Sequence, residues 1–293
     1  MNKLSRILLI INHEKNIPPE FLSILEMILT DNECYVFAFA DSHAYLESKN
    51  CSIKHGILTN NSALKDIDMA IVLGGDGSIL RASTTLSAYD VPILGINFGT
   101  LGYMAELEAK DVQLLSDVLH GDYKIDERMM LSTVIEKADG SKVMMPPALN
   151  DIVLSNGPVA RILNFTVSCN GVMIEKCRAD GMVISTPTGS TAYSMSAGGP
   201  VMAPGLEVLC LTPICPHSFS SRPVILQGDS TVVISDIGAV RDNSVYITVD
   251  GRLAERIESG DSLVITRAET RTKLIRLKNN SFLSVLNSKL QEV

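Results

Sequence analysis

The chain contains a glycine-rich turn with a carboxylate in its middle, Gly74-Gly75-Asp76-Gly77. The turn follows the apolar run Met69–Leu73 and precedes Ser78–Ala82, a plausible first helical turn. Glycines there let the backbone approach a phosphate closely, and a helix start presents free N–H groups. Because a carboxylate would repel that phosphate, we expect Asp76 either to hold a metal ion or to accept a proton from an attacking hydroxyl. The alternative is a tight turn capped by Asp76.

Two further segments carry groups suited to a nucleoside. Gly95–Met104 closes a second predicted strand, and its Phe98 offers a ring face on which a base can stack. Asn150 can bond an adenine edge as donor and acceptor together, and the adjacent Asp151 can accept from ribose hydroxyls. The alternatives are a buried loop anchor for Phe98 and a strand-initiating turn for the Asn-Asp pair.

A third segment, Asp180–Ser194, is rich in hydroxyl groups. From Ser185 to Tyr193 nearly every residue is hydroxyl-bearing or glycine, and such a loop leading into a helix offers many donors to a sugar or phosphate. The alternative is an ordinary polar loop. His217 has no identifiable serine, acidic or metal-ligand partner in the sequence, so we assign it no function.

Composition narrows the class of protein. The 293 residues carry a net charge of -8, which argues against a nucleic-acid partner because phosphate binding needs a basic surface. No apolar run reaches membrane-spanning length, so we expect no membrane partner. The six cysteines form no C-x-x-C pair and no zinc spacing, which predicts buried free thiols and a cytoplasmic location.

The pattern of apolar residues changes near Lys124. Before it, strand and helix signals alternate, which predicts βαβ units and a mostly parallel sheet. After it, short β segments separated by turns such as Asn170-Gly171 and Asp250-Gly251 predict an antiparallel, sandwich-like domain. We therefore expect an α/β domain at residues 1–124, a β-rich domain at 125–268 and a helical tail at 269–293, with a ligand cleft between the domains. The predicted elements are strands at 6–11, 34–39, 69–73, 91–97, 131–137, 162–169, 182–185, 223–226, 231–234, 244–249 and 262–265, and helices at 18–29, 111–119 and 281–290.

Five motifs in order give the chain a close resemblance to the NAD kinase family. They are Gly74–Gly77, Asn97–Tyr103, Asn150-Asp151, Asp180–Tyr193 and Thr212–Pro223. The first is shared with phosphofructokinases and lipid kinases, whereas Thr186-Pro-Thr-Gly-Ser-Thr-Ala-Tyr193 is specific. The resemblance implies the same two domains, with the tail packing back on the first. It also implies transfer of a phosphoryl group from ATP or polyphosphate to the 2′-hydroxyl of the adenosine ribose of NAD. The resemblance further implies a divalent cation, expected to be magnesium, and assembly into a homodimer or homotetramer.

The resemblance also implies roles for individual residues. Asp76 is the base, Gly77 contacts substrate and Arg81 lies near the donor phosphates. Asn150 and Asp151 hold adenine and ribose, whereas Arg161, Arg178 and Asp180 lie near the pyrophosphate and nicotinamide. The adenosine pocket is lined by Thr191, Ala192, Tyr193, Ser194 and Ser196.

Three positions bear on how this chain differs from its relatives. Several members have Glu in place of Asp151, and some bacterial members have Gln where this chain has Arg252. A charged residue at 178 is similar to members that prefer NAD over NADH. The competing functions are a lipid kinase that shares the glycine-rich turn, and a non-catalytic NADP-binding sensor; an intact Asp76 argues against the sensor.

Overall fold

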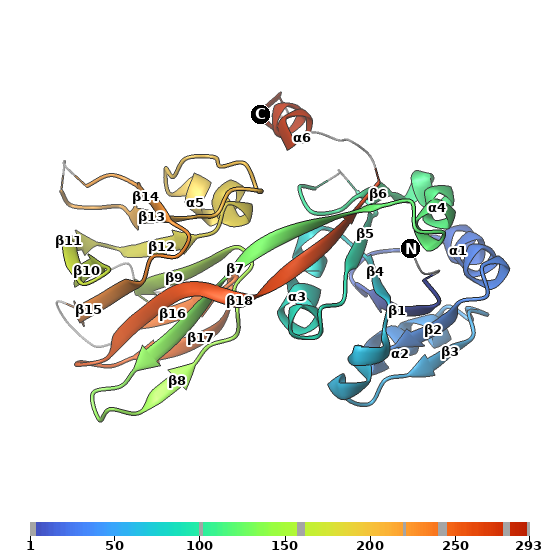
Figure 1. Cartoon of the computed structure of the whole chain (residues 1–293), viewed down its shortest axis with the longest axis horizontal. Coiled ribbons are helices and arrows are strands. Elements are labelled where there is room, and N and C mark those ends of the chain that lie inside the picture. Colours follow the sequence, from blue (N-terminus) through green and yellow to red (C-terminus); the bar gives the residue numbers. More distant parts are fainter. Residues whose placement is uncertain are drawn as a thin grey trace. The chain divides into compact units, whose positions relative to one another are not determined.

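The computed structural model describes residues 4–99, 102–156, 162–218, 221–239, 245–277 and 282–291 (Figure 1). The chain divides into two compact units. Unit 1 consists of Met1–Glu127 together with Thr272–Val293, and unit 2 consists of Arg128–Arg271. In sequence, unit 2 is therefore an insertion into unit 1.

A parallel sheet forms the centre of unit 1. Its strand order is β18-β5-β4-β1-β2-β3, and β6 pairs with β5. Every residue of β4 is buried, as expected for a strand covered on both faces. Because the strand order reverses between β1 and β4, their carboxyl ends mark the edge where open α/β sheets bind ligands. The bounds are β1 Arg6–Ile11, β2 Tyr35–Ala38, β3 His55–Ile57, β4 Met69–Leu73, β5 Ile93–Asn97, β6 Leu107–Glu108 and β18 Ser262–Arg276, whose last residues belong to unit 1.

Among the helices of unit 1, apolar spacing in the sequence predicts α1 but not α2. α1 starts after Pro18 and buries five apolar residues spaced three or four apart, so the predicted helix is confirmed. α2 is mostly polar and was not predicted; it buries Tyr45 and Leu46. The predicted helix at 111–119 is a 3₁₀ turn followed by a short α-helix. The bounds are α1 Pro19–Asp31, α2 Ala40–Ser48, η1 Asn61–Asp66, α3 Asp76–Leu86, η2 Ser87–Tyr89, η3 Ala109–Leu114, α4 Leu115–Leu119 and α6 Phe282–Gln291.

Unit 2 is built from antiparallel strands in two sheets. One has the order β14-β13-β12-β9-β16-β17, and the other runs β11-β10-β15-β18, with β7 against β18 and β8 against β7. Apolar side chains from both, including Phe165, Ile184, Ile234 and Leu263, form one buried cluster, so the sandwich-like prediction is confirmed. The bounds are β7 Lys124–Glu136, β8 Lys142–Met144, β9 Asp151–Asn156, β10 Leu163–Cys169, β11 Val172–Ala179, β12 Gly181–Ser185, η4 Thr188–Thr191, α5 Tyr193–Ser196, β13 Val208–Ile214, β14 Val224–Gln227, β15 Val232–Ala239, β16 Val245–Val249 and β17 Arg252–Ile257.

Two of the predicted turns are confirmed as tight hairpins. Asn170-Gly171 joins β10 to β11 and Asp250-Gly251 joins β16 to β17, and all four residues have positive φ. A third turn signal in the sequence, Asn156-Gly157-Pro158, lies largely outside the described residues.

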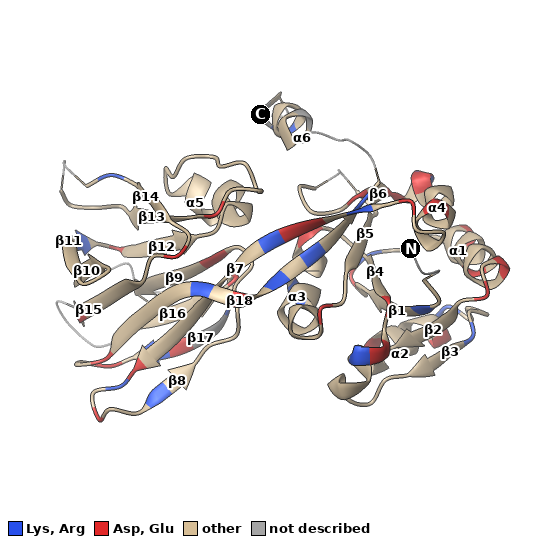
Figure 2. Cartoon of the chain, viewed as in Figure 1, with Lys and Arg blue, Asp and Glu red and all other residues tan. Residues whose placement is uncertain are grey.

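Charged and cysteine side chains are distributed unevenly. Figure 2 shows acidic residues on α1 and α4 and basic residues along β18. All six cysteines are free, as predicted. The prediction that they are buried is confirmed for Cys177 and Cys210, holds only in part for the three half-buried ones and is wrong for exposed Cys215. None of the helices in the described ranges is both long and apolar enough to span a bilayer.

Candidate active site

The glycine-rich turn links β4 to α3 as predicted, and its carboxylate is tightly held. Gly75 is the extended residue before the helix and Asp76 is the first helical residue. Oδ2 of Asp76 accepts the N–H of Tyr103 at 2.8 Å, and Oδ1 accepts those of Met104 at 3.1 Å and Ala105 at 3.4 Å. The aspartate is therefore not a cap of its own helix. It is fixed by the segment 103–105, which follows β5.

Gly102 allows this close approach. A Cβ atom at position 102 would lie 2.0 Å from Oδ1 of Asp76, where no side chain fits. Burial, and then the negative charge of Asp76, raises the pKa of the neighbouring Tyr103. The second glycine of the Asn97–Tyr103 motif thus makes room for the carboxylate of the first motif.

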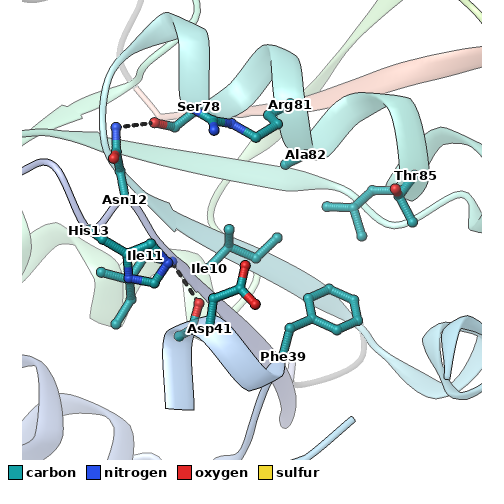
Figure 3. Close-up of a pocket in the computed structure, with 12 residues that line it drawn as sticks. Ile10, Ile11, Asn12, His13, Phe39, Asp41, Ser78, Arg81, Ala82 and Thr85 are labelled. Carbon is teal, nitrogen blue, oxygen red and sulfur yellow. Dashed lines mark hydrogen bonds between the residues drawn. The ribbon is translucent and has the colours of Figure 1, made fainter. Parts of the chain in front are cut away.

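A cavity of about 310 Å³ lies beside α3 in unit 1 (Figure 3). Its walls come from the end of β1, the start of α2 and the α3 face that carries Ser78, Arg81, Ala82 and Thr85. Nδ2 of Asn12 donates to Oγ of Ser78 at 3.0 Å, which ties the end of β1 to the helix. The cavity also presents the polar side chains of His13, Asp41 and Arg81, and the Phe39 ring. It has the size and mixed lining of a small-molecule site.

In unit 2, a second aspartate organises the Asn150-Asp151 pair. Asp250 is buried, and its carboxylate accepts the N–H groups of Leu149 at 3.0 Å, Asn150 at 2.8 Å and Asp151 at 3.1 Å. Within the described ranges, the buried Oδ1 atom of Asn150 has no hydrogen-bond partner. A buried acceptor without a donor is costly, which favours a ligand that supplies one.

The two carboxylates of this cluster ionise differently. Burial, and then the negative charge of Asp250, raises the pKa of Asp151 to about 7. Burial also raises the pKa of Asp250, and three backbone N–H groups and the nearby Arg252 offset this rise only in part. Because of these donors, Asp250 is the member of the pair that carries the charge, and Asp151 titrates near neutral pH.

The hydroxyl-rich segment packs against the Asn150 loop. The hydroxyl of Thr186 donates to the Leu149 carbonyl at 2.6 Å, and the backbone N–H of Thr186 donates to the Asn150 carbonyl at 2.9 Å. The guanidinium of buried Arg128 donates to the Thr188 hydroxyl at 3.3 Å. The structure therefore brings together the third and fourth predicted motifs and adds Asp250.

The remaining predicted residues of unit 2 lie in varied settings. Tyr193 and Ser196 are exposed, whereas Thr191 and Ala192 are half-buried. Ser194 is fully buried and its hydroxyl bonds that of Thr212 at 3.0 Å. Arg178 is exposed at the end of β11, next to half-buried Asp180, and His217 is exposed. Arg161 lies outside the described residues.

In unit 1, Gly77 and Arg81 are exposed, and Phe98 is half-buried. The Phe98 ring packs edge-to-face on Phe21, with 4.8 Å between ring centroids. Three residues that position the site were missed by sequence reasoning: Asn12, Arg128 and Asp250. Only Asp250 carried a sequence signal, as part of a predicted Asp-Gly turn, and that signal indicates a hairpin and not an anchor.

The two parts of the chain match the two domains of one known protein family. Residues 10–123 match the ATP-NAD kinase N-terminal domain, and residues 149–277 match the ATP-NAD kinase C-terminal domain. The chain belongs to the NAD kinase family. It is a kinase that transfers a phosphoryl group onto NAD, and neither alternative, lipid kinase or sensor, is favoured.

Individual members of the NAD kinase family resemble the chain over most of its length. The NAD kinase of Natranaerobius thermophilus is 35% identical over 285 residues, covering 96% of each chain. That of Geobacter metallireducens is 41% identical over 225 residues, 76% of this chain and 78% of the relative. Yeast NADH kinase complexed with NADH superposes with a TM-score of 0.88 at 26% identity, over 99% of this chain and 88% of that one. An Archaeoglobus fulgidus NAD kinase in complex with ATP has a TM-score of 0.74 at 22% identity, over 98% of this chain and 99% of that one, and shares the fold.

Gly102→Ala tests the contact between the two motifs of unit 1. The added Cβ must displace the Asp76 carboxylate, so we expect kcat for NAD phosphorylation to fall about 100-fold, as when a reacting group moves by about 1 Å. Gly99→Ala is the matched control, because a Cβ there meets nothing within 4 Å. Equal kcat values for the two variants would contradict the proposed contact.

Asp151→Asn tests the raised pKa of Asp151. A carboxyl whose pKa is higher in the folded than in the unfolded state binds more protons when folded, so its stabilising effect is lost as pH rises toward 7. Between pH 5 and pH 8, the free energy of unfolding of wild type should therefore fall relative to that of Asp151→Asn. Exposed Asp139, whose pKa is lowered, titrates below this window, and Asp139→Asn should show no such trend. Parallel curves for wild type and Asp151→Asn would rule out the shift.

Proposed function

We propose that this NAD kinase transfers the γ-phosphoryl group of ATP to the 2′-hydroxyl of the adenosine ribose of NAD, giving NADP and ADP, with Asp76 as the catalytic base. The observation that carries the proposal is the Asp76 carboxylate, held by three N–H groups at the start of α3. A carboxylate fixed in this way is oriented for one acceptor hydroxyl.

Phosphoryl transfer depends more on the position of the catalytic base than on its strength as a base. In phosphoryl transfer the hydroxyl oxygen forms its bond to phosphorus while the bond to the ADP oxygen breaks, and positioning and electrostatics supply most of the catalysis. Asp76 accepts the hydroxyl proton as that bond forms. Gly77, next along α3, contacts the reacting phosphate through its backbone.

The adenosine of NAD is bound by unit 2. Oδ1 of Asn150 accepts from the adenine amino group, which provides the donor that this buried atom lacks. The Asp151 carboxyl accepts a hydrogen bond from a ribose hydroxyl. Thr191, Ala192, Tyr193 and Ser196 line the same pocket, and Ser194 supports it through Thr212. Arg161, Arg178 and Asp180 serve the pyrophosphate and nicotinamide, and Arg178 favours NAD over NADH.

The donor triphosphate is bound by unit 1. Arg81 faces the cavity beside α3, which also holds Asp41, suited to ribose hydroxyls, and the Phe39 ring, suited to a base (Figure 3). The domain description "ATP-NAD kinase" and the ATP bound to the Archaeoglobus fulgidus enzyme support a nucleotide donor over polyphosphate. Phe98 stays a candidate for base stacking through the ring surface that Phe21 leaves uncovered.

A magnesium ion fits a site of this kind. Magnesium is commonly held by substrate phosphates and one or two carboxylates, and Asp76 is a carboxylate placed at the phosphate end of α3. When bound, the ion would neutralise charge on the transferring phosphoryl group. No group of three or more His, Cys, Asp or Glu side chains in the described ranges is placed to hold a metal alone.

The other properties expected of the protein concern its assembly and the residue Arg252. We expect a homodimer or homotetramer in the cytoplasm. Arg252 acts on the site indirectly, through its effect on the charge of Asp250.

Asp76→Asn tests the base. Incubation with NAD, ATP and magnesium, followed by assay with an NADP-specific dehydrogenase, should give a kcat at least about 100-fold below wild type. The melting temperature should fall slightly, because the new amide NH₂ group opposes a backbone N–H donor. The Kd for NAD, measured by calorimetry, should stay within about threefold of wild type. Near wild-type turnover would eliminate Asp76 as the base.

A crossed pair of variants tests which unit binds which substrate. Asn150→Ala should raise the KM for NAD by a factor corresponding to about 1–3 kcal/mol and leave the KM for ATP nearly unchanged. Arg81→Gln should do the reverse. If Asn150→Ala lowers only the melting temperature, the Asn150-Asp151 pair is a structural turn. If Arg81→Gln leaves the KM for ATP unchanged, the donor is bound elsewhere.

A further inference from the structure

Arg276 is a charged residue at a position where the strand pattern expects a core residue. Along β18, Thr272 and Leu274 are buried, and Arg276 follows them at the strand period of two, on the same face. Its side chain is only 19% exposed. Placing a guanidinium there is costly unless every donor finds an acceptor, so its partners indicate what it is for.

Those partners converge on one segment. Nη1 of Arg276 donates to the Met104 carbonyl at 3.0 Å and Nη2 to the Tyr103 carbonyl at 3.3 Å. The charge is balanced by Glu106, at 3.3 Å from Nη1, and by Asp126, at 3.2 Å from Nε. Glu106 is buried and also accepts the N–H of Leu277 at 3.0 Å. It therefore fixes both the guanidinium of Arg276 and the backbone of the next residue.

The same segment holds Asp76 from its other side. The peptide unit between Tyr103 and Met104 offers its carbonyl to Arg276 and its N–H to Oδ1 of Asp76. The next unit, between Met104 and Ala105, does the same. Each of the two peptide groups therefore bridges the cation and the carboxylate, and the two hydrogen bonds made by one peptide group strengthen each other.

We propose that Arg276 is a positioning residue for the phosphoryl-transfer step. It clamps residues 103–105 so that their N–H groups keep the Asp76 carboxylate in its reactive orientation, and it touches neither NAD nor ATP. The proposal rests on the proposed role of Asp76. It predicts a defect in turnover, because orientation of the base matters in the transition state and not for holding either substrate.

A double-mutant cycle tests the proposal. Arg276→Met should lower kcat by about 10- to 100-fold with both KM values within about threefold of wild type. In the Asp76→Asn background the same change should cost less than about threefold, because no carboxylate is left to orient. Arg276→Lys, which keeps the charge but loses the planar fork, should be intermediate. An equal loss in both backgrounds, or unchanged kcat in Arg276→Met, would overturn the proposal.

Lys273→Met is the matched control, because it removes a different ion pair, with Asp90, from the same strand. Its kcat should equal that of wild type. Hydrogen exchange of the peptide that spans residues 103–106 gives a readout independent of turnover: exchange should quicken in Arg276→Met and not in Lys273→Met. Unchanged exchange in Arg276→Met overturns the clamp whatever Asp76 does, whereas wild-type turnover in Asp76→Asn overturns the proposed function.

Discussion

In each unit, one aspartate carboxylate accepts the N–H groups of three consecutive residues. Asp76 binds residues 103–105 and Asp250 binds residues 149–151. Hydrogen bonds to a charged acceptor are roughly twice as strong as neutral ones, so a single side chain sets the path of a whole loop. The proposed chemistry depends on these two arrangements: in unit 1 the anchoring carboxylate is itself the proposed base, and in unit 2 it holds Asn150 and Asp151, the proposed contacts of the adenosine.

Helix α3 separates two kinds of environment in unit 1. Its first residue, Asp76, is turned toward the segment after β5, whereas Ser78, Arg81, Ala82 and Thr85, spaced three and four apart, form one face along the cavity. The helix therefore presents the proposed base, Asp76, on one side and the cation Arg81 on the other within little more than one turn. On the proposed mechanism, this separation lets Arg81 bind the polyanionic donor while Asp76 accepts the proton of the neutral hydroxyl.

The sequence predicted what is local and missed what is long-range. Strand β4, helix α1 and the two hairpin turns follow from apolar spacing and turn chemistry within a few residues. The polar helix α2 lacks that spacing and was missed. Motifs marked the loops that carry Asp76 and Asn150, but not the residues that hold those loops. Asp250 and Arg276 reach their partners from about 100 or more positions away, and a single sequence does not record such pairings. Strand β18 also continues well past the predicted end at residue 265. Its second half was missed because charged residues interrupt the apolar pattern there, although Leu274 is buried.

The insertion of unit 2 into unit 1 has a consequence for biosynthesis. A ribosome delivers residues 1–127 first, and the Leu274 end of β18, which pairs with Ile93 of β5, emerges only after all of unit 2. Until then, part of the β5 edge is uncovered, and an open strand edge invites pairing with other chains. The guanidinium of Arg276 arrives with the same segment. The sheet of unit 1 therefore stays incomplete in the nascent chain until the end of β18 emerges, and the proposed clamp on residues 103–105 forms only then.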